Sequence, residues 1–308
     1  MEKLAFFFID DVIMTMRDIA RQRPASLFDH PFMAMLKKGH DLYGMTVQLN
    51  LFYRTDFFYG GEEFTLSQFP DCYKPEFEAS ADWLRLAFHA KQEFPDYPYV
   101  NGSYEDVKRD FEQLRAEVFR FAGEKSWSHT VIPHWLPISR EGCQALYDGG
   151  IRFMAPSWGD REEYNGDPAS LPYGHWARLL QNRQPETMVY TRKSKNTAIL
   201  NSICAYNHVT DEEYDSVRLK NASILDEGTG MRFRQLSGGP CLNLYTYDEV
   251  QPAYDAILGA EYIGTANHEE YFYSDYYAYQ PDYVDKVLLA AKIMHENGYR
   301  YITADEFK

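Results

Sequence analysis

The feature that most constrains the fold is an alternation of short apolar runs with helix-like stretches along most of the 308 residues. The run from Leu4 to Ile9 is typical of a buried strand. Residues 104–122 carry apolar side chains at spacings of three and four, which is typical of an amphipathic helix. This alternation predicts an α/β protein in which β-α units surround a mainly parallel sheet.

The other expected elements follow the same pattern. We expect further helices at residues 28–38, 140–147 and 282–295, and further strands at residues 45–52, 83–88, 131–132, 151–155, 261–265 and 299–303. Ser139 is the expected N-cap of its helix, and Gly298 is expected to end the last one. Between about residues 160 and 240 the alternation weakens, which indicates an elaborated insertion with some antiparallel strands. With no Gly/Ser-rich linker in the sequence, we expect a single domain over residues 1–308.

The charge balance narrows the classes of partner. A formal net charge of -15 creates a negative field that repels phosphate groups, so a nucleic acid or an anionic membrane surface is disfavoured. A neutral or cationic small molecule is the expected partner, and the composition also permits a homo-oligomer. The apolar run near the N-terminus is too short for a signal-peptide core, and no later run has the length of a membrane helix. We therefore expect a cytoplasmic protein.

Chemically active side chains recur where predicted strands end. Asp10 and Asp11 follow the first strand, and His89, His134 and His268 follow three others. Catalytic groups of β/α sheets and barrels collect at the carboxyl ends of the strands. Carboxylates and imidazoles gathered there could hold a divalent metal with an open position, beside an acid and a base. The Asp10-Asp11 pair by itself could equally well cap a helix.

The segments around these residues resemble the polysaccharide deacetylases, carbohydrate esterase family 4. FFFIDDV resembles the first motif of that family, and WLRLAFHA places a histidine where the family has its first metal histidine. VIPHWLPISREGCQALYDGGIRFMAPSW and, later, NHEEYF with ENGYRYITADEF resemble further motifs in the same order. The resemblance implies a distorted (β/α) barrel of about seven parallel strands. It also implies a metal-dependent hydrolase, a deacetylase acting on an N- or O-acyl group of a carbohydrate or related small molecule.

The resemblance assigns roles to individual residues. Asp10 matches the general base of the family, Asp11 and His89 match metal ligands, and His268 matches the general acid. Such a set is chemically coherent, because a base must take a proton from the water nucleophile and an acid must protonate the departing group.

Two departures from the family pattern leave the third metal ligand open. The second histidine of the family's H-x-x-x-H motif is Glu93 here, and the family's Arg-Pro-Pro segment reads Ile132-Pro133-His134. His134 is the first choice for the third ligand because it adds an imidazole at a neighbouring strand end, and Glu93 is the second. A single divalent ion, zinc, is the expected cofactor.

Residues beside the same strand ends are candidates for binding the substrate: Trp135, Trp158, Glu269 and Tyr271. Aromatic rings at these positions could stack on a sugar ring, although packing around the mouth of a barrel or at a subunit interface explains them equally well.

A second function remains open at the level of the sequence. The altered motifs are compatible with an inactive carbohydrate-binding or regulatory protein that retains the deacetylase fold. Against this, a binding protein has no need of a base, metal ligands and an acid at four separate strand ends.

Overall fold

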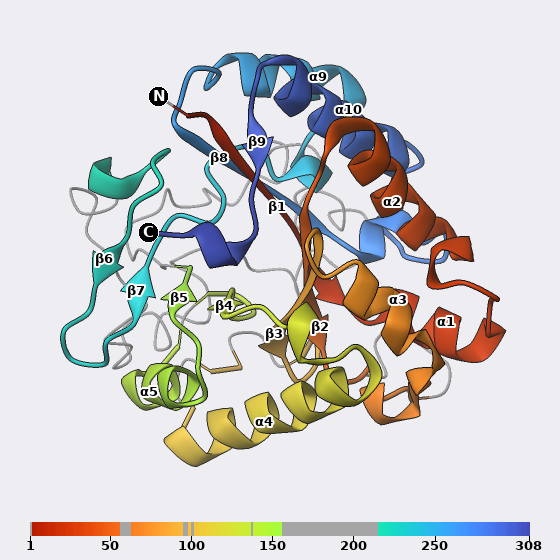
Figure 1. Cartoon of the computed structure of the whole chain (residues 1–308), viewed down its shortest axis with the longest axis vertical. Helices are drawn as coiled ribbons and strands as arrows, with labels where there is room; N and C mark the ends of the chain where they lie inside the picture. The colour runs from red at the N-terminus through yellow and green to blue at the C-terminus, as the bar shows by residue number, and fades with distance from the viewer. Residues whose placement is uncertain (1, 56–62, 95–97, 100–101, 137, 156–214) are drawn as a thin grey trace.

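The computed structural model describes residues 2–55, 63–94, 98–99, 102–136, 138–155 and 215–308, and its strands form two sheets (Figure 1). The first sheet has the order β3-β2-β1-β8, with β9 also paired to β1, and comprises β1 (Leu4–Val12), β2 (Val47–Phe52), β3 (Leu84–Ala90), β8 (Tyr262–His268) and β9 (Arg300–Tyr301). The second has the order β4-β5-β7-β6 and comprises β4 (Thr130–Val131), β5 (Phe153–Met154), β7 (Arg232–Phe233) and β6 (Ile224–Leu225). All described pairings are parallel except that of β6 with β7. The predicted α/β class with a mainly parallel sheet is therefore confirmed.

Backbone hydrogen bonds connect β3 and β8 of the first sheet to residues that precede β4 and follow β7 in the sequence. The N–H of Ser128 donates to the carbonyl of Leu86 in β3 over 2.8 Å, and the N–H of Ala266 in β8 donates to the carbonyl of Pro240 over 3.1 Å. Apolar side chains pack inside the strands, among them Leu4, Phe6, Phe8, Ile132, Tyr262 and Phe307. The strands thus surround a common interior, in keeping with the predicted distorted barrel.

Helices lie around the outside of the strands in Figure 1. They are α1 (Met14–Gln22), α2 (Pro31–Tyr43), α3 (Lys74–Ala79), α4 (Tyr104–Phe121), α5 (Arg140–Asp148), α9 (Tyr247–Asp255) and α10 (Tyr283–Glu296). Short 3-10 turns occupy Leu27–Asp29, Leu66–Gln68, Asp71–Tyr73, Glu124–Ser126, Leu242–Leu244, Glu270–Phe272 and Ala304–Glu306. Because β1 side chains alternate between faces, Ala5, Phe7 and Ile9 belong to the larger core that includes the helices.

Most of the predicted elements are present, with shifted ends. Ser139 accepts a hydrogen bond from the N–H of Gly142 over 2.9 Å and caps α5, as predicted. The helix expected at residues 28–38 begins instead at Pro31, after a 3-10 turn, and it ends before Gly44, whose φ is 68°. The antiparallel pairing of β6 with β7 agrees with the expectation for the end of the 160–240 insertion, and residues 156–214 lie outside the described residues.

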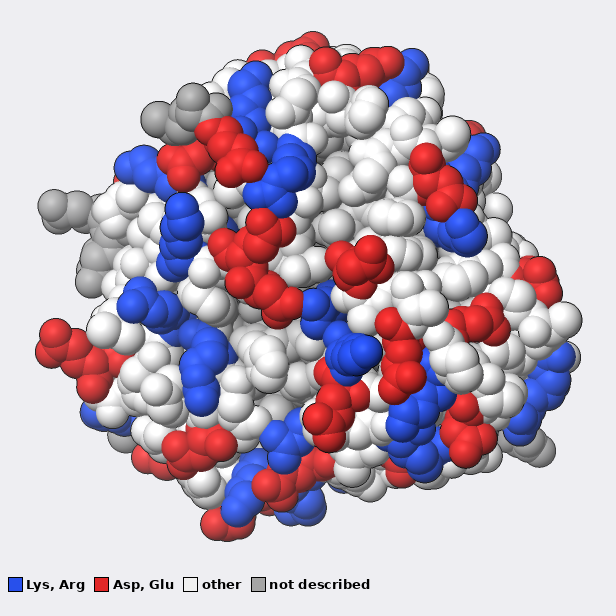
Figure 2. Space-filling model, in the orientation of Figure 1, with Lys and Arg blue, Asp and Glu red and all other residues white. Residues whose placement is uncertain are grey.

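Positive and negative side chains are interspersed on the face of the molecule seen in Figure 2. Arg300 illustrates this arrangement, since it forms ion pairs of 2.8 Å with both Glu2 and Glu306. Among the helices that the structure describes, none combines the length and apolar character needed to cross a membrane.

Candidate metal centre and active site

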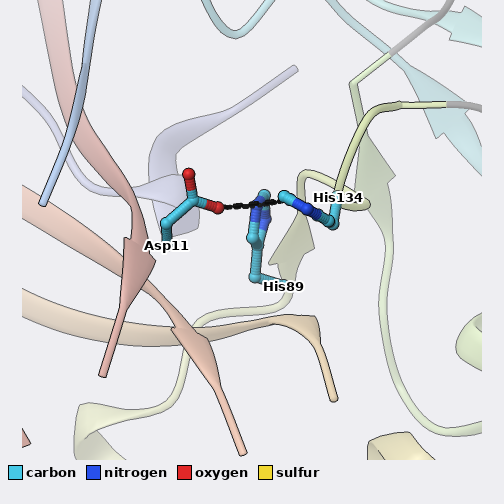
Figure 3. A group of neighbouring side chains, drawn as sticks. All are labelled: Asp11, His89 and His134. Atoms are coloured by element: carbon cyan, nitrogen blue, oxygen red, sulfur yellow. Dashed lines mark hydrogen bonds and ion pairs between the residues drawn. The ribbon is translucent and has the colours of Figure 1, made fainter. Parts of the chain in front are cut away.

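Three side chains from separate segments meet at the carboxyl ends of the strands (Figure 3). Asp11 lies in β1, His89 lies in β3 and His134 follows β4. Asp11 Oδ1 is 3.0 Å from His89 Nε2 and 3.2 Å from His134 Nδ1, and the two nitrogens are 3.1 Å apart. All three side chains are buried. The three atoms therefore form a nearly equilateral triangle shielded from water.

The outer nitrogen of each imidazole is occupied by a backbone carbonyl. His89 Nδ1 is 2.6 Å from the carbonyl oxygen of Ile132, and His134 Nε2 is 3.0 Å from that of Glu93. A carbonyl oxygen only accepts, so each outer nitrogen carries the proton and donates it. A neutral imidazole held in this way presents a lone pair at its other nitrogen. The triangle then consists of three acceptors, which repel one another unless a cation, a proton or a metal ion, lies among them.

The donor set of this triangle fits a divalent metal ion. Zinc bonds of about 2.0–2.1 Å in tetrahedral geometry correspond to ligand atoms about 3.3 Å apart, close to the edges observed here. Two imidazoles and one carboxylate are typical of catalytic zinc sites, which keep a further position open. Carbonyl groups that orient the outer ring nitrogens are also typical of metal-binding histidines.

The backbone at Asp11 explains how two adjacent aspartates reach the same site. Neighbouring side chains on a regular strand point to opposite faces. Here the β1–β2 pairing shifts register between Ile9 and Val12, and Asp11 has a left-handed φ of 63°. Both carboxylates consequently approach His89: Asp11 Oδ1 at 3.0 Å and Asp10 Oδ1 at 3.9 Å.

Charge and hydrogen bonding keep Asp11 ionised. Burial acts to raise the pKa of Asp11. When a proton rather than a metal ion lies among the three atoms, the charge and hydrogen bonding of His134 and the hydrogen bond from His89 outweigh burial and hold that pKa well below its ordinary value. Asp11 is thus a carboxylate, the form that binds a metal ion.

Asp10 lies beside the triangle in a different environment. It accepts a hydrogen bond of 2.6 Å from Asn50 Nδ2. Burial raises the pKa of Asp10 above its ordinary value, against the opposing charges of His89 and His268. A carboxylate with a raised pKa is a stronger proton acceptor than an exposed one.

His268 faces Asp10 across the pairing of β1 with β8. Its Nδ1 is 2.9 Å from Asn243 Oδ1, so Nδ1 donates to the amide oxygen and Nε2 is the nitrogen left to exchange protons. Cys241 Sγ donates to the same oxygen over 3.0 Å. The sequence did not point to Asn243, because it lies in a 3-10 turn 25 residues before His268 with no motif around it.

Of the two candidates for the third ligand, the structure brings His134 to the triangle. Glu93 lies on the far side of the His134 ring. The Oε1 atom of Glu93 is 3.8 Å from His134 Nε2, the nitrogen that points away from Asp11 and His89. Its backbone carbonyl, rather than its carboxylate, holds the ring.

Glu269 and Glu270 have different environments. Glu269 is fully buried and accepts three backbone N–H groups at the start of α1, from Ile13, Met14 and Thr15, over 2.7–2.8 Å. Burial raises the pKa of Glu269 to about 7, while these bonds and the Thr15 side chain lower it. Glu269 therefore caps α1 instead of making the substrate contact predicted from the sequence.

Glu270, which follows His268 and Glu269 at the end of the same strand, interacts with the site through its carboxyl group. Burial raises the pKa of Glu270 well above its ordinary value, and the charges of Asp11 and Glu93 add to this effect. Its Oε2 is buried and has no hydrogen-bond partner among the described residues.

The aromatic candidates flank the same residues. The ring of Trp135 is half-buried with its centroid 5.6 Å from that of His134, and the ring of Tyr271 is buried at 6.2 Å from that of His268. Trp158 lies outside the described residues.

The cap on α1 leads to a stability prediction. Glu269→Ala leaves three buried N–H groups without an acceptor, so the free energy of unfolding should fall by about 1–3 kcal/mol. Glu112→Ala, which truncates an exposed glutamate of α4, is the control and should change it by less than about 0.5 kcal/mol. Equal stability of the two variants in denaturant unfolding would contradict the capping role.

The triangle predicts which variant loses metal. His134→Ala should weaken zinc binding by about 10²-fold or more, because it removes a ligand, whereas Glu93→Gln preserves the carbonyl that holds the ring and should cost less than about 10-fold. Competition with a chromophoric chelator measures both affinities. The reverse order of the two variants would make Glu93 the third ligand.

The structure is similar to several solved structures, although neither a protein-family model nor a curated protein matches the sequence. The 4-alpha-glucanotransferase of Thermococcus litoralis aligns with 99% of this chain at a TM-score of 0.52 and 10% identity. This chain spans 40% of the length of that enzyme. At this identity the likeness establishes a shared fold alone.

Two further solved structures align with nearly the whole chain at lower TM-scores. The family 4 acetyl xylan esterase of Clostridium thermocellum has a TM-score of 0.41 at 10% identity, over 99% of this chain and 89% of that one. The Xyl-CE4 domain of a xylanase from the hindgut metagenome of Trinervitermes trinervoides has a TM-score of 0.40 at 14% identity, with the same coverage.

Proposed function

We propose that this protein is a metal-dependent hydrolase that removes an N- or O-acyl group from a carbohydrate or related small molecule, with one zinc ion as cofactor. The observation that carries the proposal is the convergence of Asp11 Oδ1, His89 Nε2 and His134 Nδ1 within 3.0–3.2 Å, all as acceptors. A cation bound among the three atoms would offset their repulsion. Asp10, the proposed base, and His268, the proposed acid, lie beside the triangle.

The residues divide the chemistry among them. Asp11, His89 and His134 would hold the cation, which when bound supplies the Lewis acidity that polarises an acyl carbonyl. Asp10 takes a proton from the water nucleophile with the carboxylate oxygen that does not accept from Asn50. His268 gives a proton from Nε2 to the departing amine or alkoxide, while Asn243 keeps the ring in the required tautomer.

The charge of the site favours a particular kind of substrate. Asp10, Asp11, Glu93 and Glu270 gather around one cation, and the chain as a whole carries a net charge of -15. A neutral or cationic acyl compound enters such a field more readily than an anionic one. Trp135 and Tyr271 are the described rings available to contact it, and a cytoplasmic location remains a prediction.

The first test combines metal content with activity. Protein purified without added metal should contain about one zinc per chain and hydrolyse N-acetylated sugars or simple acyl esters. Asp10→Asn should keep the metal and lower turnover by about 10²-fold or more, because it removes the base while preserving shape. A parallel loss of metal and activity would make Asp10 a ligand. Sugar binding without hydrolysis would favour the inactive carbohydrate-binding protein.

The role of His268 predicts a dependence on the leaving group. His268→Ala should lower the hydrolysis of amides by about 10²-fold or more and that of activated esters much less, because activated esters need little protonation of the departing group. His295→Ala, which truncates an exposed histidine of α10, should leave both rates unchanged. Equal losses on the two substrate types would make His268 a structural residue.

A further inference from the structure

A line of buried polar side chains runs through the interior beneath Asp10, and the proposed reaction does not require it. Gln48 and Asn50 lie on β2, and Ser128 lies just before β4. Each is at most 1% exposed. Apolar side chains would fill such an interior without the cost of burying amides and a hydroxyl group.

The three residues form one continuous chain of short hydrogen bonds that ends on Asp10. Ser128 Oγ donates to Gln48 Oε1 over 2.6 Å, and Gln48 Nε2 donates to Asn50 Oδ1 over 2.8 Å. Asn50 Nδ2 then donates to Asp10 Oδ1 over 2.6 Å.

Contacts at both ends of this hydrogen-bond chain determine which group donates and which accepts in each bond. The N–H of Thr130 donates to Ser128 Oγ over 3.3 Å, which favours donation of the Ser128 hydrogen to Gln48. Gln48 therefore presents its oxygen to Ser128 and its NH2 group to Asn50. At the other end the carboxylate of Asp10 only accepts, so Asn50 must present its NH2 group there. Both amides are thus held in one orientation.

We propose that Asn50 is a positioning residue for Asp10, and that Gln48 and Ser128 prevent its amide from turning over. The inference rests on the proposed function, in which Asp10 is the base and Asp11 is a ligand. The two carboxylates are neighbours on the same His89 ring: Asp11 Oδ1 contacts Nε2, and Asp10 Oδ1 lies 3.9 Å from Nδ1, on the other side of the ring. The bond from Asn50 holds Asp10 toward the interior, so that Asp11 alone joins the triangle and one oxygen of Asp10 stays available for the proton.

The hydrogen-bond chain can be tested because its members lie at different numbers of hydrogen bonds from Asp10. Asn50→Leu removes the donor at similar volume and should lower kcat by about 10–10²-fold, with KM and zinc content unchanged. Ser128→Ala breaks the chain two bonds away and should lower kcat by about threefold. In the Asp10→Asn background, Asn50→Leu should have no further effect on kcat, because the residue acts through Asp10.

Ser126→Ala is the matched control. Ser126 is equally buried two positions away, but its hydroxyl group donates to the carbonyl of Ala122 and not to the chain. It should cost similar stability to Ser128→Ala and leave kcat unchanged. Equal effects of the two serine variants on kcat would reduce Ser128 to a structural residue, and full additivity of Asn50→Leu with Asp10→Asn would overturn the positioning role.

A spectroscopic measurement separates this inference from the proposed reaction. In the 15N-labelled protein, the side-chain NH2 resonances of Asn50, assigned through their loss in Asn50→Leu, should shift in Asp10→Asn and in Ser128→Ala but not in Ser126→Ala. If these shifts occur but the parent protein shows no hydrolysis, the proposed function is wrong and the hydrogen-bond chain is still supported. Hydrolysis by the parent, with Asn50 resonances insensitive to both variants, would defeat the inference alone.

Discussion

Mutual repulsion among three buried acceptors is the constraint on which the site depends. Asp11 Oδ1, His89 Nε2 and His134 Nδ1 stand 3.0–3.2 Å apart, and with the outer ring nitrogens donating to the carbonyls of Ile132 and Glu93, neutral imidazoles place no hydrogen between them. Holding like partial charges so close requires rigid surroundings. The structure supplies them as buried strand ends, and the backbone has left-handed φ angles at Asp11 and directly after His134, at Trp135. Strain of this kind collects at functional sites, where the rest of the fold maintains it.

The position of β1 in the sheet provides much of this rigidity. It pairs with β8 over most of its length, with β9 at its start and with β2 from Phe8 onward, and all of its residues are buried. Asp10 and Asp11 therefore belong to a strand that is enclosed on all sides. The two carboxylates have different neighbours: Asp10 accepts a hydrogen bond from Asn50, whereas Asp11 lies against the two imidazoles. Glu269 holds the start of α1, which follows them.

The sequence predicted the parts of this arrangement that depend on periodicity and strand ends. Alternation located β1, α4 and α10, and the strand-end rule selected Asp11, His89 and His134 without knowledge of their contacts. Periodicity could not foresee the register shift at Asp11. Helix α1 was missed because its short, partly polar segment begins directly after a strand, and α9 because Pro252 lies within it.

Adjacent glutamates look alike in a sequence, so only packing could reveal that Glu269 caps a helix while Glu270 meets the site. Asn50 and Asn243 stand in no motif, and their roles depend on contacts between distant segments.

The pairing of β1 with β8 and β9 has a consequence for synthesis of the chain. During synthesis, β1 finds two of its partners only when residues 262–268 and 300–301 have been translated. Until then the nascent chain exposes an apolar strand with an unpaired edge, a template for aggregation. Contacts between such distant residues also slow folding after release. A chaperone that shields β1 during translation would therefore protect the segment that carries both aspartates.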